Sequence, residues 1–281
     1  MSKVICLYHA NCLDGFGSAA IVRSKYIDAK LIPVHYGRDL PNISYKDAKV
    51  FIVDFSYDIA TMNDILSRGA DSITVIDHHK TAEYLNECIG LNPRISLYIE
   101  TSNDKYSGVG LCWNYFYGDM CDLPPVLRAI QDRDIWKFKE DHTKEICAAL
   151  RLHEQDANLA ARLVNSQSIF LNELILTGSV LMQKFHKDLE ILYKQRCWIN
   201  FAGYKVPAVN APPMYASELG EMLAVGEAFG VVWSFNGRNF SVSLRSSPTG
   251  IDVSEVAKLV GGGGHKHAAG CSVNTYMFSP I

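Results

Sequence analysis

Three groups able to bind a metal ion or to move a proton follow one another at the end of an apolar run. The segment TVIDHHK (74–80) passes directly from strand-type residues to Asp77, His78 and His79. Runs of this β-branched kind are typical of strands buried on both faces, so the three side chains should lie where a strand gives way to a loop. A carboxylate beside two imidazoles is suited to metal binding or to acid–base chemistry.

Acidic residues at the ends of other apolar runs extend this pattern. Asp14 follows His9 and a first apolar run, Asp54 ends a second run, and Asp132 lies in the segment AIQDRDIW. One such residue alone is unremarkable, because Asp is common in turns and helix caps. Gathered at one sheet edge, however, several carboxylates would raise one another's pKa unless a cation neutralised them. The sequence therefore predicts a metal site.

The donor set indicates which cation fits. Carboxylates mixed with imidazole suit Mn²⁺, Fe²⁺, Zn²⁺ or Co²⁺, whereas an all-oxygen set would suit Mg²⁺ or Ca²⁺; Mn²⁺ is our first prediction. Two ions about 3.5–4 Å apart, bridged by a carboxylate, are a common device for in-line attack on phosphorus. Asp54, alone at the end of the middle run, is the predicted bridge.

The elements that would position these residues alternate between strand and helix. Apolar runs at 4–8, 50–53 and 73–76 predict strands, and helices are predicted at 17–26 and 59–68. This order is typical of a parallel sheet built from βαβ units, in which ligands bind beyond the carboxyl ends of the strands. We therefore predict an α/β, doubly wound catalytic domain over 1–156.

The remaining chain predicts a helical connector and a second, smaller domain. Residues 157–197 carry apolar residues three and four apart, the period of long helices. From 198 to 281 the segments are again β-rich, with Asn236-Gly237 as a hairpin turn. This part is predicted to be an α/β domain with a mixed sheet that binds substrate.

Composition limits the class of protein. The 281 residues are 48% hydrophobic and 20% charged, as in globular proteins of one or two domains. A net charge of −3 without a basic block argues against a long nucleic-acid duplex as partner. No apolar segment approaches the roughly 20 residues that cross a bilayer. Eight scattered cysteines and no secretory signal before the first apolar run favour the cytoplasm. A homodimer is one possible assembly.

The motifs resemble those of the DHH phosphoesterase superfamily. His9 and Asp14 in YHANCLDGFGSAA, Asp54 in VFIVDFSY, the segment VIDHH, and Asp132 in QDRDIW appear in the order of its four N-terminal motifs. GGGGHKHAAG (261–270) is similar to the glycine-rich signature of the C-terminal domain found in one branch. That branch includes single-strand exonucleases, oligoribonucleases, phosphatases of 3′-phosphoadenosine 5′-phosphate and cyclic-dinucleotide phosphodiesterases. The resemblance covers nearly the whole chain.

The resemblance implies a role for each matching residue. The metal ligands it implies are His9, Asp14, Asp54, His78 and Asp132. His79 would contact the scissile phosphate or protonate the leaving oxygen, while Asp77 would orient a histidine, as metal-bound imidazoles usually require. Of the paired histidines, we assign His78 to the metal. For Asp134 we predict the role of a surface or helix-cap acid.

One residue departs from the family pattern. The first motif usually contains two aspartates spaced Asp-x-Asp, and here Cys12 stands in the place of the first. Cys12 could supply a thiolate that favours Zn²⁺ or Fe²⁺, or it could simply pack and leave one metal position weak. Whether two ions bind therefore stays open at this point.

The C-terminal glycine-rich stretch predicts a substrate-binding site. It is not a P-loop, because that loop needs Ser or Thr after the Lys, whereas His267 follows Lys266. Glycine lets backbone N–H groups approach a phosphate, and a nearby Arg can clamp one bidentately. The predicted substrate-binding residues are Arg245, Gly262, Gly263, Gly264 and His265. Trp136, Tyr215 and Trp233 are possible base-stacking residues for which we predict core positions instead.

These features predict a metal-dependent phosphoesterase that hydrolyses short nucleotides or oligonucleotides, for example as a 5′-to-3′ exonuclease. Alternative substrates are 3′-phosphoadenosine 5′-phosphate, cyclic dinucleotides and polyphosphate. An alternative of another class is a catalytically weak nucleotide-binding protein, with Cys12 marking a degenerate site. An inorganic pyrophosphatase shares the N-terminal motifs, but its C-terminal domain is of another type.

Overall fold

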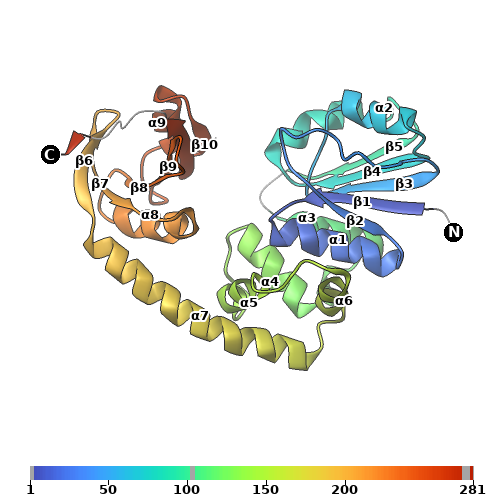
Figure 1. Cartoon of the computed structure of the whole chain (residues 1–281), viewed down its shortest axis with the longest axis horizontal. Helices are drawn as coiled ribbons and strands as arrows, with labels where there is room; N and C mark the ends of the chain where they lie inside the picture. Colours follow the sequence, from blue (N-terminus) through green and yellow to red (C-terminus); the bar gives the residue numbers. More distant parts are fainter. Residues whose placement is uncertain (1–2, 102–104, 274–278, 281) are drawn as a thin grey trace. The chain divides into compact units, whose positions relative to one another are not determined.

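The chain folds into two compact units. The computed structural model describes residues 3–101, 105–273 and 279–280, and the units cover Met1–Met182 and Gln183–Ile281. Figure 1 labels their elements. The boundary falls inside α7 (Ser168–Lys194), a helix of 27 residues within the segment predicted as the connector. The three-part division at 156 and 197 stays a prediction.

A five-stranded parallel sheet forms the centre of the first unit (Figure 1). The strands run in the order β2-β1-β3-β4-β5, and their bounds are β1 Lys3–His9, β2 Lys30–Val34, β3 Ala48–Val53, β4 Ser72–Asp77 and β5 Ile95–Ile99. The three predicted strands are the three central ones, and the predicted α/β fold is confirmed. The sequence pattern does not predict β2 and β5, because these edge strands are only partly buried and their apolar runs are interrupted.

Helices cover both faces of this sheet, as parallel sheets require. Figure 1 shows α1 (Leu13–Lys25) and α3 (Gly108–Tyr117) on one face and α2 (Ile59–Ser67) on the other; a 3₁₀ helix follows β4 at Lys80–Cys88. Alternate residues of β1 supply the two cores. Cys6 and Tyr8 belong to the core under α1 and α3, whereas Ile5 and Leu7 belong to the core under α2. The sheet is therefore doubly wound, as predicted.

A helical layer follows the sheet in the chain. It consists of a short 3₁₀ helix at Met120–Asp122, α4 (Pro125–Asp134), α5 (Thr143–Leu150), α6 (Ala157–Asn165) and the start of α7. The helical pattern predicted from residue 157 onward is thus observed as α6 and α7. Among the described helices, α7 included, none combines the length with the apolar composition needed to cross a bilayer.

The second unit contains a mixed sheet with the order β10-β11-β9-β8-β7-β6-β12. β7 and β8 are parallel and the other neighbours are antiparallel. The strands are β6 Cys197–Phe201, β7 Tyr204–Asn210, β8 Gly230–Phe235, β9 Phe240–Arg245, β10 Gly263–His265, β11 Ala268–Val273 and β12 Ser279–Pro280, with α8 (Ala216–Ala224), α9 (Val253–Leu259) and a 3₁₀ helix at Pro213–Tyr215. The predicted hairpin turn joins β8 to β9, where Asn236 accepts hydrogen bonds from the amides of Arg238 and Asn239.

Candidate metal centre

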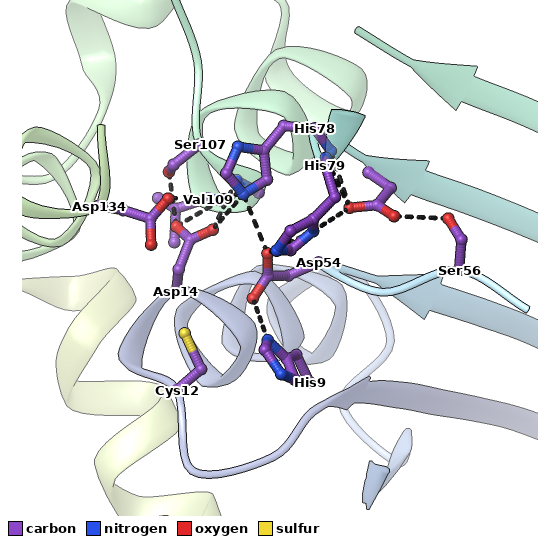
Figure 2. A network of polar contacts seen from close by, with 12 residues as sticks. His9, Cys12, Asp14, Asp54, Ser56, His78, His79, Ser107, Val109 and Asp134 are labelled. Carbon is purple, nitrogen blue, oxygen red and sulfur yellow. Dashed lines mark hydrogen bonds and ion pairs between the residues drawn. The ribbon is translucent and has the colours of Figure 1, made fainter. Parts of the chain in front are cut away.

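Acidic and imidazole side chains converge at the carboxyl edge of the five-stranded sheet (Figure 2). His9 ends β1, Asp54 follows β3, and His78 and His79 follow Asp77 at the end of β4. Parallel strands present these ends at the same edge, which is why residues from separate runs meet. Asp14 joins them from the first turn of α1 and Asp134 from the last turn of α4.

His78 and Asp54 lie at the middle of the cluster. His78 Nε2 is 3.2 Å from Asp54 Oδ1, 3.5 Å from Asp134 Oδ2 and 3.7 Å from Asp14 Oδ2. The other oxygen of Asp54, Oδ2, is 3.5 Å from His9 Nδ1. The two oxygens of Asp54 therefore face different ligands, which is the geometry that a bridging carboxylate needs.

The backbone at Asp54 is held in an uncommon conformation. Its φ is 51°, in the left-handed region that few residues other than Gly, Asn and Asp adopt. Its N–H donates to the carbonyl of Ile76 at 3.0 Å, which ties the residue to β4. Backbone conformations of this kind persist where the surroundings fix them, often at functional sites. Here the conformation turns the buried carboxylate toward the cluster.

Asp14 is fixed by the N-terminus of α3. Its carboxylate accepts hydrogen bonds from Ser107 Oγ at 2.5 Å and from the backbone amides of Gly108 at 2.6 Å and Val109 at 3.0 Å. The first amides of a helix lack partners inside the helix and attract anions. Gly108 is required for this approach, because a Cβ there would lie 2.7 Å from Asp14 Oδ2.

His79 belongs to a separate hydrogen-bonded chain. Its Nδ1 is 2.7 Å from Asp77 Oδ1, and Asp77 Oδ2 accepts a hydrogen bond from Ser56 Oγ at 2.5 Å. The side chain of Asp77 is fully buried and also accepts from the amide of His78 at 2.8 Å. Asp77 therefore orients His79, whereas His78 points into the carboxylate cluster.

The charges in the cluster depend on one another. Burial and the charges of Asp134 and Asp54 raise the pKa of Asp14, and burial also raises the pKa of Asp134. Burial alone would raise the pKa of Asp54 too, but the neighbouring imidazoles of His78 and His9 lower it to about 2. Burial opposes a charge on His78, yet Asp54, Asp14 and Asp134 raise its pKa to about 10. A proton on His78 thus partly balances the acids in the metal-free protein.

Three overlapping groups of side chains have the donors and spacing to hold a cation. Within each group the ligand atoms lie within 4.8 Å of one another; the groups are His9, Cys12 and Asp54, then Asp54, His78 and His79, then Asp14, His78 and Asp134. Asp54 Oδ2 and His9 Nδ1 are buried and receive no hydrogen bond from the described residues, although such atoms are almost always paired. A divalent cation would supply the missing partner, so these residues fit a metal.

Asp132 lies outside this cluster, and its predicted place there is wrong. Its carboxylate accepts hydrogen bonds from the amides of Lys139 and Glu140 and from Thr143 Oγ1, at 2.9, 3.0 and 2.6 Å. The chain after α4 uses these bonds to turn into α5. The residue that reaches His78 is Asp134, for which we predicted a surface or cap role. Helical period places Asp134 on the face of buried Leu127 and Ile130, but Asp132 follows buried Ala129 by three positions, so the period does not choose between the two acids.

A cavity of about 510 Å³ adjoins the cluster within the first unit. Its lining includes Cys12, Asp14 and Asp134 of the cluster, together with Arg133, Trp136 and Arg151. Trp136 is 45% exposed, so its predicted core position is wrong. In contrast, Trp233 packs against the core of the second unit and Tyr215 against a smaller buried cluster there.

The predicted substrate-binding residues gather in the second unit. Arg245 ends β9, and its guanidinium donates to Ser217 Oγ at 3.1 Å. Gly263, Gly264 and His265 form β10, which pairs with β11. A Cβ at Gly264 would lie 2.5 Å from the Cα of Ala269, so this glycine is needed for strand pairing whether or not a ligand binds. His265 is exposed.

Comparisons with known proteins agree with this architecture. The DHHA1 domain family matches residues 211–276. Uncharacterized protein R106 of Acanthamoeba polyphaga mimivirus is 30% identical over 95% of this chain, and oligoribonuclease NrnB of Bacillus subtilis (strain 168) is 25% identical over 97%. The chain spans 66% and 73% of the length of these relatives. A structure of exonuclease RecJ bound to manganese has a similar fold, with a TM-score of 0.57 and 16% identity over 97% of this chain and 86% of that one.

Proposed function

The chain belongs to the DHH/DHHA1 phosphoesterase superfamily, and we propose that it is a divalent-metal-dependent phosphodiesterase that acts on short nucleotides or oligonucleotides. The observation that carries this proposal is the convergence of His9, Asp14, Asp54, His78 and Asp134 at one sheet edge. The carboxylates of Asp14 and Asp54 are buried, unlike those of a solvated surface, so they need a counter-charge.

In this proposal the ligands divide around Asp54. His9 and Asp54 Oδ2 serve one metal position, and His78, Asp14 and Asp134 serve the other, with Asp54 Oδ1 between them. Mn²⁺ suits this mixture of oxygen and nitrogen donors, and the related RecJ structure holds manganese. When bound, such ions polarise the phosphoryl oxygens and make an activated water available at neutral pH.

The proposed contact with the scissile phosphate, or proton donation to the leaving oxygen, is assigned to His79. Asp77 accepts the hydrogen bond of its Nδ1, which leaves Nε2 as the ring atom available to a substrate. Burial alone would lower the pKa of His79, but the hydrogen bond and charge of Asp77, together with Asp54, raise it. A protonated His79 can donate a hydrogen bond to the scissile phosphate or a proton to the leaving oxygen.

Features around the cluster favour a nucleotide as substrate. The adjoining cavity brings two arginines and the exposed Trp136 beside Asp14 and Asp134, a combination suited to a phosphate and a base. The relative NrnB is an oligoribonuclease. The net charge of −3 agrees with a substrate of few phosphates. In the second unit, Arg245, Gly262, Gly263, Gly264 and His265 are proposed to bind a phosphate group.

Substrate and metal can be tested together. Purified protein loaded with Mn²⁺ should cleave ribodinucleotides in preference to 3′-phosphoadenosine 5′-phosphate, a cyclic dinucleotide or polyphosphate. Oligonucleotides labelled at the 5′ or 3′ end give the direction, which we propose to be 5′ to 3′. Cleavage of polyphosphate alone would contradict the nucleotide proposal. Tight nucleotide binding without turnover would support the alternative of a nucleotide-binding protein.

The role of Asp54 gives the sharpest mutational test. Asp54→Asn should abolish turnover and lower the number of bound metal ions, because the amide is a poor bridge between two cations. Asn tolerates the left-handed backbone at this position, so circular dichroism should show an unchanged fold. Metal content by elemental analysis and hydrolysis of a dinucleotide check the prediction. Wild-type turnover in the variant would rule out the bridging role.

A further inference from the structure

The side chain of Cys12 is directed at the cluster. Its Sγ, a nitrogen of His9 and an oxygen of Asp54 lie within 4.8 Å of one another, and Figure 2 shows the sulfur on the same side as Asp14 and Asp54. The three atoms belong to a thiol, an imidazole and a carboxylate, which are the donor groups found in zinc sites. The position is therefore equipped for a metal even though one expected aspartate is missing.

The local backbone does not account for this orientation. Cys12 is the N-cap of α1, and it makes no side-chain capping hydrogen bond. N-cap positions favour Ser, Thr, Asp and Asn, whose oxygens accept such a bond. Cys12 thus does not provide the capping hydrogen bond that usually stabilises a helix start, and its sulfur lies near His9 and Asp54 instead.

An independent observation points to a ligand at the same place. Asp54 is only 1% exposed, and its Oδ2 receives no hydrogen bond from the described residues. His9 Nδ1 lies 3.5 Å from this oxygen, an ion-pair distance, and likewise makes no hydrogen bond with the described residues, whereas Oδ1 is 3.2 Å from His78 Nε2. The two atoms of the centre without a hydrogen bond, Asp54 Oδ2 and His9 Nδ1, therefore belong to the group of residues that contains Cys12.

We propose that Cys12 supplies a thiolate ligand and makes the two metal positions chemically different. One position has sulfur, nitrogen and oxygen donors from Cys12, His9 and Asp54, and the other has only nitrogen and oxygen donors from His78, Asp14 and Asp134. Sulfur favours softer ions, so the first position should prefer Zn²⁺, Co²⁺ or Fe²⁺ and the second should accept Mn²⁺. The thiol proton passes to solvent when the cation binds. This inference rests on the proposed metal centre and is independent of the substrate.

Cobalt is a suitable probe because thiolate ligation gives Co²⁺ a charge-transfer absorption in the near ultraviolet. Wild-type protein titrated with Co²⁺ should develop this band, and Cys12→Ser and Cys12→Asp should lack it. Both variants place a favoured N-cap residue at the start of α1, so they should fold, which circular dichroism verifies. Cys197→Ser, which removes an exposed thiol of the second unit, is the matched control and should keep the band.

Competition between metals gives a second measurement. Cys12→Ser should lose Zn²⁺ affinity at one position by more than the roughly 10- to 100-fold that even outer-shell partners contribute. Cys12→Asp should bind two ions and shift its preference toward Mn²⁺. If wild-type protein binds Co²⁺ without the band, or Cys12→Ser retains it, the thiolate assignment is wrong while the phosphodiesterase proposal stands. If wild-type protein binds no Co²⁺, both are overturned.

Discussion

Two aspartates only two positions apart in α4 have different surroundings. Asp132 is buried and accepts bonds from the backbone that leads into α5, whereas Asp134 faces His78 across 3.5 Å. Both are acids at the end of one helix, so their types do not separate a structural from a ligand role. The hydrogen-bond or ion-pair partners of each carboxylate do separate the two roles, and these partners are set by the fold.

Alanine variants at these two positions should give opposite results. Asp132→Ala should lower the free energy of unfolding by on the order of 2–3 kcal/mol, because two backbone amides lose a buried acceptor. Asp134→Ala should change it by less than about 1 kcal/mol but weaken metal binding. Urea denaturation of the metal-free protein and Mn²⁺ titration measure the two effects. A stable Asp132→Ala that binds metal poorly would reverse the assignment.

Most of the cluster could be predicted from single residues. Six residues of the cluster end or directly follow an apolar run, or begin the helix after one: His9, Asp14, Asp54, Asp77, His78 and His79. Parallel strands bring such positions together at one edge of the sheet. Asp134 could not be chosen over Asp132, since the choice depends on how α4 rotates against α1. Ser107 and Gly108, which hold Asp14, carry no chemical signal of their own.

At the scale of elements, α2 shows how a helix start beside the sheet is stabilised. Asp58 is its N-cap and accepts a hydrogen bond from the amide of Thr61 at 2.7 Å. That bond lowers the pKa of Asp58. A carboxylate whose pKa is lowered by folding contributes stability above its unfolded pKa and loses it as the pH falls through the folded value. The contribution of Asp58 is therefore full at neutral pH and absent in strong acid.

Asp58→Ala should cost about 1 kcal/mol of unfolding free energy at neutral pH, and the difference from wild type should shrink below the ordinary Asp pKa of about 4. Asp58→Asn caps without titrating, so its difference from Asp58→Ala should stay constant with pH. Urea denaturation of the three proteins across this range provides the measurement. A constant difference between wild type and Asp58→Ala would show that the charge at this cap is irrelevant.

Strand prediction succeeded or failed according to position in the sheet. β3 and β4 are buried on both faces and appear in the sequence as continuous apolar runs. β2 contains Pro33 and is mostly part-exposed. An edge strand tolerates both features, but they interrupt the apolar run from which a strand is predicted. The topology was nevertheless predictable, because the central strands and their helices define a doubly wound sheet.

At the scale of the whole molecule, each of the two units carries its own set of proposed functional residues. The proposed metal ligands belong to the first unit and Arg245 to the second. A residue that grips a phosphate away from the breaking bond holds substrate and transition state equally. Its loss should therefore raise KM and leave kcat almost unchanged.

Arg245→Ala should raise KM for a dinucleotide by about 10- to 100-fold, the effect expected from losing hydrogen bonds to a charged group. Arg238→Ala is the matched control, since Arg238 is an exposed arginine in the β8–β9 turn of the same unit and should leave KM unchanged. Steady-state kinetics with Mn²⁺ measure both. Equal affinity of the Arg245 variant and wild type would remove Arg245 from the binding site.

The tie between Asp14 and the start of α3 has a consequence for biosynthesis. Asp14 takes its hydrogen bonds from Ser107 and Val109, 93 and 95 positions later in the chain, and its neighbour His78 meets Asp134. A nascent polypeptide on the ribosome cannot assemble these contacts until translation has passed Asp134. The proposed metal centre is thus incomplete while the first half of the chain is being made.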